Sequence, residues 1–115
     1  MSVPAAGTTI DAFAALDLRV GRVARAEPFP EARKPSIRLW IDFGPLGLRT
    51  SSAQLTARYT PAALVGRQVV AVVNLPPRRV AGFASEVLVL GAVEADGAVV
   101  LLKPDQDVTE GTPIA

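Results

Sequence analysis

Residues 36–43 read SIRLWIDF, and this stretch carries the clearest secondary-structure signal in the chain. Every second side chain from Ile37 to Phe43 is apolar, whereas Arg38, Trp40 and Asp42 face the other way. Strict alternation of this kind is typical of a β-strand with one buried face. We therefore expect a strand over 36–43, with Trp40 exposed beside Arg38.

The segment before this strand predicts another strand and a loop. LRVGRVARA (18–26) begins as a strand, but its apolar pattern changes parity after Val20. Gly21 lies at the change, where a β-bulge or a sharp coil of the strand is expected. EPFPEARKP (27–35) is expected to be a loop, because prolines cannot donate hydrogen bonds to a sheet.

The N-terminal region predicts one short helix. Residues 9–16 combine helix-forming side chains with Thr9 or Asp11 as a capping residue. Residues 1–8 are small and polar enough to be flexible.

Beyond residue 43 the chain alternates turns and short strands. Gly-Pro-Leu-Gly (44–47) predicts a turn into a third strand over 48–54. Thr60-Pro61 is a helix start, and Gly66 ends that helix after one or two turns. Further strands are expected at RQVVAVVN (67–74), SEVLVLGAV (85–93) and AVVLLKP (98–104).

About six short strands with small helices between them predict an all-β fold. The bulged first strand, and the helix between the third and fourth strands, favour a five-stranded Greek-key barrel of the OB type with N- and C-terminal extensions. A mixed sheet is the alternative, since strands apolar on both faces also occur in parallel sheets. Most connections are too short for parallel crossovers, and 115 residues suffice for one domain, so we expect a single barrel over 1–115.

Two strands are apolar on both faces, namely VVAVV (69–73) and VLVL (87–90). A small barrel buries only the inner face, and each Val or Leu left exposed forfeits about 1.5–3 kcal/mol of burial. We therefore predict a homodimer, with the helix over 9–16 and the extension over 92–115 contributing to it. The alternative is an intramolecular lid formed by the two chain ends.

Composition argues against catalysis. The chain has no cysteine and no histidine, which excludes disulfides, thiol nucleophiles, imidazole bases and the usual zinc ligands. Lys34 and Lys103, the two lysines, lack a serine at a suggestive spacing, and GPLGLRTSS lacks the lysine of a phosphate-binding loop. We expect no enzyme, no metal and no cofactor.

The N-terminus resembles no signal peptide and no apolar run could insert into a membrane, so a cytoplasmic location is expected.

Charge is distributed unevenly along the chain. Residues 1–79 carry eleven of the twelve basic side chains and a net charge of +6, whereas residues 80–115 carry −5. Such asymmetry can create a local positive field, although it can also reflect a merely solvated surface. Prolines flank both basic pairs, Arg33-Lys34 in the loop and Arg78-Arg79 in the PPRR corner, and ordering a proline-braced loop costs little entropy.

These side chains suggest two kinds of ligand. Basic groups can contact RNA phosphates, and short polar groups can contact sugars or base edges. The RNA-binding candidates are Arg33, Lys34, Ser52, Asn74, Arg78, Arg79 and Ser85. Arg38 and Trp40 are the candidates for peptide binding. Trp40 could instead stack on a base or contact a second copy, and the PPRR corner could simply end a strand.

Five short motifs carry a resemblance to a known family. They are DLRVG (17–21), ARKP (32–35), SSAQ (51–54), NLPP (74–77) and SEVLVL (85–90). Their order over about residues 13–91 resembles the tRNA-binding domain family, whose members include the C-terminal domain of bacterial methionyl-tRNA synthetases and free-standing relatives. Similarity is greatest to an export-related, chaperone-like branch.

The resemblance implies an OB barrel, a homodimer held partly by elements outside the barrel, no cofactor and no catalysis. It also implies two ligands, structured tRNA and unfolded or precursor polypeptide. The chain departs from the usual family pattern where Ser-Gly becomes Ser52-Ala53 and Ser-Glu-Gly-Met becomes Ser85-Glu86-Val87-Leu88. Both changes resemble the chaperone-like branch and add apolar bulk that suits a surface receiving another chain.

Overall fold

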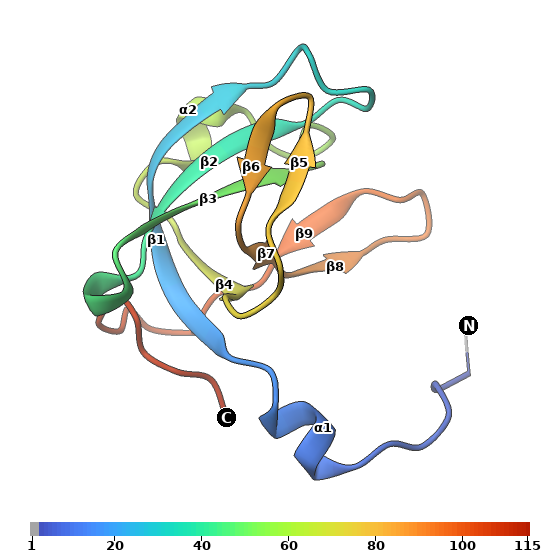
Figure 1. The fold of residues 1–115 in the computed structure, drawn as a ribbon. Coiled ribbons are helices and arrows are strands. Elements are labelled where there is room, and N and C mark those ends of the chain that lie inside the picture. Colours follow the sequence, from blue (N-terminus) through green and yellow to red (C-terminus); the bar gives the residue numbers. More distant parts are fainter. Residues whose placement is uncertain (1–2) are drawn as a thin grey trace.

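The fold is built on one antiparallel sheet that coils into a nearly closed barrel (Figure 1). The computed structural model describes residues 3–115. Five strands form the barrel sheet in the order β3-β2-β1-β4-β7, and β5–β6 and β8–β9 form two further hairpins. The predicted OB barrel is confirmed, and every strand pair in the described residues is antiparallel. The elements are α1 (Ile10–Ala14), β1 (Leu18–Pro28), β2 (Ile37–Asp42), η1 (Gly44–Leu46), β3 (Leu48–Ala53), α2 (Pro61–Leu64), β4 (Gln68–Val72), β5 (Arg78–Val80), β6 (Phe83–Ser85), β7 (Leu88–Val89), β8 (Gly91–Val93) and β9 (Val99–Leu101).

The long strand β1 joins the two halves of the barrel. Its first residues, 18–22, pair with β4, and its later residues pair with β2 as far as Pro28. The register with β2 shifts between Val23 and Arg25. The bulge therefore lies at Ala24, so its predicted position at Gly21 is wrong. The predicted loop start at residue 27 is also wrong, because β1 continues to Pro28.

Gly21 serves packing instead. A Cβ at this position would lie 2.5 Å from Cγ2 of Ile41 and 2.7 Å from Cε1 of Phe43. Both of these side chains are fully buried in the barrel core. The parity change in the sequence arises because Gly21 faces this core, whereas Leu18 and Val20 belong to a separate cluster.

The barrel interior confirms the alternation predicted over 36–43. Every second side chain from Ile37 to Phe43 is buried there, together with Val69 of β4. The predicted turn forms η1 and leads into β3. Helix α2 begins at Pro61 as predicted and contributes the fully buried Leu64 to the core.

The segment after β4 differs most from the sequence-based expectation. The prediction of one strand over 85–93 is wrong, because β6, β7 and β8 share these residues. The basic corner, predicted as a loop, places Arg78 and Arg79 in the first strand of a hairpin. Ala81 and Gly82 form its turn with φ values of 46° and 83°. Positive φ at both central positions is typical of a type I′ turn, for which Ala-Gly is a weaker sequence signal than Asn-Gly.

Residues 107–114, here called the C-terminal strap, run along the outside of the barrel. The backbone N–H of Gly111 donates to the carbonyl of Val20 (2.7 Å), and the N–H of Val20 donates to that of Thr112 (2.9 Å). The Gln68 side chain donates to the carbonyl of Val108 (2.7 Å) and accepts from its N–H (3.2 Å). The strap is thus fixed to both β1 and β4.

The strap helps to shield the outer face of β4 from water. Val70 and Val72 form a second apolar cluster on this face. Its other members and the side chains packed on it are Leu18, Val20, Leu90 and Val108. These valines are buried within one copy, so the prediction that a second copy keeps them dry is wrong; of the two chain ends, only the C-terminal one contributes to their cover, through Val108.

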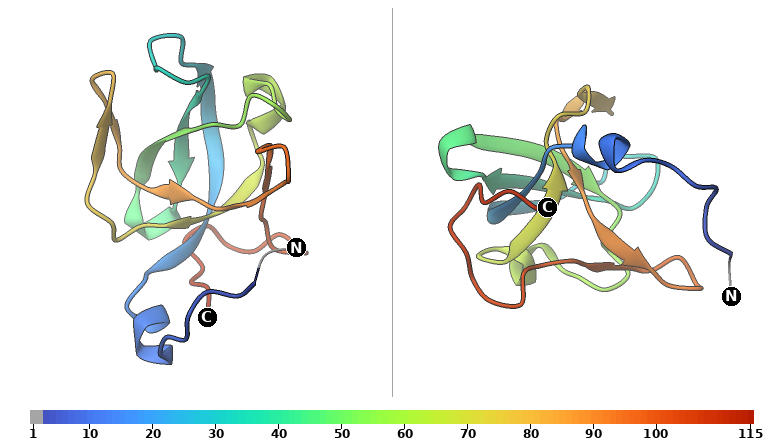
Figure 2. Two further views of the ribbon diagram at one scale, coloured as in Figure 1. Left: turned by 90° about the vertical axis from the view of Figure 1, so that its right-hand side faces the viewer. Right: turned by 90° about the horizontal axis from the view of Figure 1, so that it is seen from below.

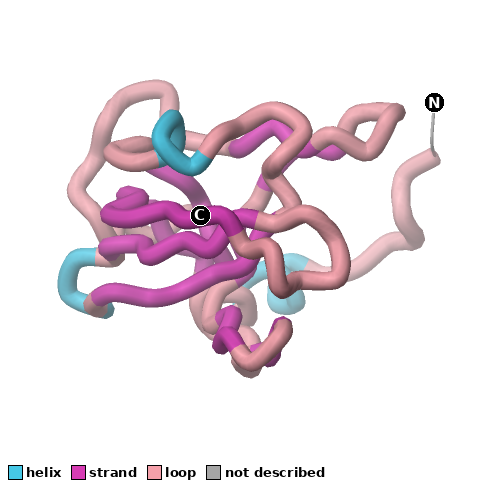
Figure 3. Tube along the Cα trace, turned by 90° about the horizontal axis from the view of Figure 1, so that it is seen from above, coloured by secondary structure: helices cyan, strands magenta, loops and turns pink. Residues whose placement is uncertain are grey.

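Helix α1 lies away from the barrel (Figures 1 and 2). All five of its residues are exposed, and the Thr9 hydroxyl accepts from the N–H of Ala12 (3.1 Å), as predicted for a cap. Both α-helices lie at the periphery of the strands (Figure 3). Residues 1 and 2 fall outside the described part, so the flexible segment predicted over 1–8 stays a prediction. Within residues 3–115, neither helix has the length and apolar character needed to span a bilayer.

Candidate ligand-binding groove

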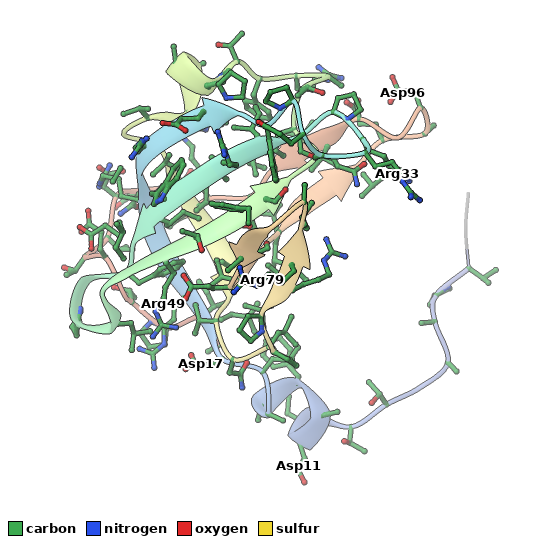
Figure 4. All side chains as sticks on the ribbon, turned by 45° about the horizontal axis from the view of Figure 1, so that its top comes forward. Asp11, Asp17, Arg33, Arg49, Arg79 and Asp96 are labelled. Carbon is green, nitrogen blue, oxygen red and sulfur yellow. The ribbon has the colours of Figure 1, made fainter. Side chains whose placement is uncertain are left out.

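Four predicted basic side chains meet at one cavity. Arg33 and Lys34 come from the β1–β2 loop, and Arg78 and Arg79 come from β5. The cavity has a volume of about 320 Å³, and its described lining residues include no carboxylate. Figure 4 shows Arg33 on its loop and Arg79 on the hairpin. The remaining lining residues of this basic cavity are Ala32, Ser36, Ser52, Gln54 and Val80.

Short-range contacts hold the loop that carries Arg33 and Lys34. The N–H of Phe29 donates to the carbonyl of Ser36 (3.1 Å) and closes the base of the loop. The Ser36 hydroxyl donates to the carbonyl of Lys34 (2.9 Å), and the Phe29 ring is buried. Both cations are therefore presented from a braced segment, while their side chains remain exposed.

A second cavity, of about 250 Å³, adjoins the basic one. Ser52 and Arg78 line both cavities, so the two lie side by side, and they are here called the groove. Its apolar walls include Leu75 and Leu88, whose exposed fractions are 39% and 52%. The other residues of this apolar cavity are Pro76, Ser85, Glu86 and Val87.

The groove continues past the basic cavity on its other side. A third cavity, of about 280 Å³, shares Gln54 with the basic one and reaches the β8–β9 turn at Asp96. Figure 4 shows Arg33 and Asp96 at the same end of the molecule.

Ser85 helps to close the barrel. Its hydroxyl accepts a hydrogen bond from the N–H of Ser52 (3.0 Å). Next to it, the Glu86 carboxylate accepts from both the N–H (3.0 Å) and the hydroxyl (2.8 Å) of Thr50. The Ser51 hydroxyl donates to the carbonyl of Val87 (2.9 Å). These bonds join β3 to residues 85–87, and they give Ser85 a structural role at the floor of the groove.

The structure does not bring Asn74 to the groove. Its side-chain amide donates to the carbonyl of Ala15 (2.8 Å), and its carbonyl oxygen accepts from the N–H of Asp17 (2.8 Å). Both bonds fix the chain between α1 and β1 to the end of β4. Asn74 therefore has a structural role: its side chain attaches the segment that follows α1 to the barrel.

Arg38 and Trp40 lie beneath the β5–β6 hairpin. The Phe83 ring packs edge-on against Trp40, with 5.7 Å between ring centroids, and the guanidinium of Arg25 lies 4.4 Å from the Trp40 ring. Arg38 donates to Glu27 (3.2 Å). Trp40 is therefore half-buried, whereas the sequence predicted it exposed, and neither residue lines the three cavities. Their assignment to peptide binding stays a prediction.

The sequence indicated apolar bulk at Val87-Leu88 that suits a surface receiving another chain, but it did not place the apolar half of the groove. The motifs NLPP and SEVLVL were recognised, but only their polar members were assigned to a site. Leu75, Pro76 and Leu88 belong to the same motifs and are the apolar wall. An available signal was that VLVL is apolar on both faces, so one of its faces needs a partner.

The barrel and its groove define an OB-type binding domain. Among residues 3–115, no group of three His, Cys, Asp or Glu side chains is placed to hold a metal ion. Residues 18–113 match the family described as "Putative tRNA binding domain", and the chain belongs to this family. The resemblance drawn from the five motifs is confirmed.

Two solved structures and one curated relative illustrate the family. The chain is similar to the chaperone CsaA of Bacillus anthracis, with 58% identity and a TM-score of 0.92 over 96% of this chain and 100% of that one. It is also similar to the CsaA chaperone protein of Picrophilus torridus, with 44% identity and a TM-score of 0.88 over 95% of this chain and 100% of that one. A methionine–tRNA ligase of Porphyromonas gingivalis is 41% identical over 102 residues, which are 89% of this chain and 15% of the ligase.

These relatives support a non-catalytic binding protein. The chain spans only about one-seventh of the ligase, and the part it matches is not the catalytic part of that enzyme. The CsaA chaperones, by contrast, are matched over their whole length.

Proposed function

We propose that this protein binds unfolded or precursor polypeptide, as a chaperone does, in the groove formed by the apolar and basic cavities. The observation that carries the proposal is that Ser52 and Arg78 join an apolar cavity to a cationic one. Apolar walls take up side chains that a folded protein would hide, and the adjoining cations keep the groove solvated. The similarity to CsaA chaperones supports the same ligand class. A cytoplasmic location remains the expectation from the sequence.

Leu88→Ala tests this proposal. Leu88 is about half exposed and lines the apolar cavity, so shortening it should weaken binding of a denatured model protein about three- to tenfold. The measurement is suppression of aggregation of that substrate, supported by anisotropy of a labelled unfolded fragment. Leu48→Ala is the matched control, because Leu48 is 57% exposed and lines none of the three cavities. Equal loss in both variants, or in neither, would contradict the proposed groove.

Binding of tRNA is the second candidate function. It is favoured by the convergence of four cations and by the description of the family. Replacing Arg78 and Arg79 together with alanine should flatten the salt dependence of tRNA binding by up to about two units. Lys103→Ala should leave the slope unchanged, because Lys103 lies outside the basic cavity. An absence of tRNA binding at low salt would remove this candidate.

The same proposal includes a homodimer. Support comes from α1, whose Ile10 is 77% exposed and whose Phe13 also faces solvent, and from exposed apolar side chains at Val100 and Leu102. We propose that a second copy covers α1 and the segment over 92–115. Phe13→Asp should then lower the sedimentation coefficient to that of a monomer. Val65→Asp should not, because Val65 is an exposed apolar residue outside both proposed interface segments. A wild-type protein that sediments as a folded monomer at micromolar concentration would refute it.

A further inference from the structure

We infer that the groove selects extended segments in which an apolar side chain and a carboxylate lie two or four residues apart. This inference rests on the proposed binding of polypeptide. It assigns the apolar cavity to the apolar side chain and the basic cavity to the carboxylate of the same ligand.

Among the described residues, the cations of the basic cavity have no acidic partner. The six ion pairs among residues 3–115 engage five other arginines, those at 19, 22, 25, 38 and 58. Arg33, Lys34, Arg78 and Arg79 belong to none of these pairs. Four unpaired cations around one cavity favour an anionic group there.

The spacing of the two cavities follows from the chain that lines them. Pro76 lines only the apolar cavity, Arg78 lines both, and Val80 lines only the basic one. An extended chain advances about 3.3 Å per residue, so Pro76 and Val80 are separated by at most about 13 Å. In an extended ligand, side chains two and four residues apart point to the same side and cover about 7 and 13 Å. An acid one or three residues away would point out of the groove.

Charge at the apolar end favours a peptide over a nucleic acid. A polynucleotide carries a phosphate on every nucleotide, so a strand following the groove would bring negative charge against Glu86 and the apolar wall. A peptide can place an apolar residue there and a carboxylate only at the cations. The ring best suited to stack a base, Trp40, is covered by Phe83 and Arg25.

Labelled twelve-residue peptides of low helix propensity test the inference. Each contains one leucine, and the second variable residue is Glu two, three or four positions before or after it, or Gln or Lys two positions before or after it. Fluorescence anisotropy should show that peptides with Glu two or four positions from the leucine bind at least about fivefold more tightly than the Gln peptide. The Lys peptide should bind more weakly than the Gln peptide. The peptide with Glu three positions from the leucine should bind with the affinity of the Gln peptide. The preference for Glu should fall with added salt.

Protein variants then locate the effect. Arg79→Glu should reverse the preference so that the Lys peptide binds more tightly than the Glu peptide, whereas Lys103→Ala should keep the wild-type order. Equal affinities for the Glu and Gln peptides would overturn the inference and leave polypeptide binding intact. If no peptide binds and tRNA does, both the inference and the proposed polypeptide function are wrong.

Discussion

Gly21→Ala tests the packing on which the barrel depends. The added Cβ would lie 2.5 Å from Cγ2 of Ile41 and 2.7 Å from Cε1 of Phe43. Carbon atoms pack best at about 3.5–4.0 Å, so each contact is about 1 Å too short. Both neighbours are fully buried, and they can move only by displacing the rest of the core. Overpacking of this kind costs about 2–3 kcal/mol.

Part of that cost is offset in the unfolded chain. Alanine has less backbone freedom than glycine, which stabilises the folded state by about 0.5–1 kcal/mol. The net loss in free energy of unfolding should be about 2 kcal/mol, equivalent to a fall in Tm of about 8 °C for a chain of this length. Urea denaturation followed by Trp40 fluorescence and circular dichroism, at one protein concentration, measures it.

Two further variants identify the cause. Gly7→Ala adds a Cβ with no atom within 4 Å, so its free energy of unfolding should change by less than about 0.5 kcal/mol. Combining Gly21→Ala with Phe43→Leu should be less destabilising than the sum of the single changes, because leucine vacates space that the new methyl needs. A loss below about 0.5 kcal/mol for Gly21→Ala, or strict additivity in the double variant, would refute the close approach.

Three other changes test the hairpin and the strap. Phe83→Ala removes two edge-on ring contacts, and it should shift the emission of Trp40, the one tryptophan, to longer wavelength because the ring gains water contact. Gln68→Leu leaves the backbone groups of Val108 without partners, and urea denaturation should show a loss of about 1–3 kcal/mol. Arg22 donates to Glu110 and lowers the pKa of that carboxyl, so its stabilisation is present above the unfolded pKa and is lost as the pH falls through the lower folded value. Glu110→Gln should therefore make stability less dependent on pH between about 5 and 3.

Each change has a control elsewhere in the chain. Phe13→Ala on α1 should leave the Trp40 emission maximum unchanged, and a shift of the same size would show that the hairpin contact is not its cause. Gln54→Leu, in the open groove, should cost less than about 0.5 kcal/mol. Glu31→Gln, on an exposed loop, should retain the wild-type pH dependence, and an identical change in both glutamate variants would exclude the Arg22–Glu110 pair as the source.

Local patterns predicted the elements that carry a simple sequence signal, such as alternating apolar residues or a capping residue followed by proline. The alternation over 36–43 gives β2 and its buried face, and Thr60-Pro61 gives the start of α2. The predicted bulge at Gly21 is wrong because a glycine that marks a bulge and one that admits a neighbouring ring look alike in sequence. A lid formed by the chain ends was one of two alternatives, but the path of the strap could not be predicted, since its hydrogen bonds connect residues about ninety positions apart, such as Val20 and Thr112.

The site was predictable in its charges and not in its shape. Arg33 and Arg78 were recognised because prolines flank both basic pairs, and the fold does bring them together. Ser85 and Asn74 were assigned to RNA, but their hydrogen bonds hold the barrel and α1. Whether a polar side chain faces a ligand or a neighbouring backbone depends on tertiary contacts, which local patterns do not contain. The cavity that Leu88 forms with Leu75 could not be predicted for the same reason.

The groove exists because the barrel is not closed by backbone pairing alone. β3 and β7 are the two ends of the five-stranded sheet, and the side chains of Ser85 and Glu86 complete the closure by bonding to β3. Two backbone bonds, from the N–H groups of Glu86 (2.8 Å) and Val87 (3.2 Å) to the carbonyl of Thr50, add to these side-chain bonds, and the apolar cavity lies beside this irregular closure. A fully paired strand here would tighten the barrel and fill the cavity. The residues that complete the fold are therefore also the ones that leave room for a ligand.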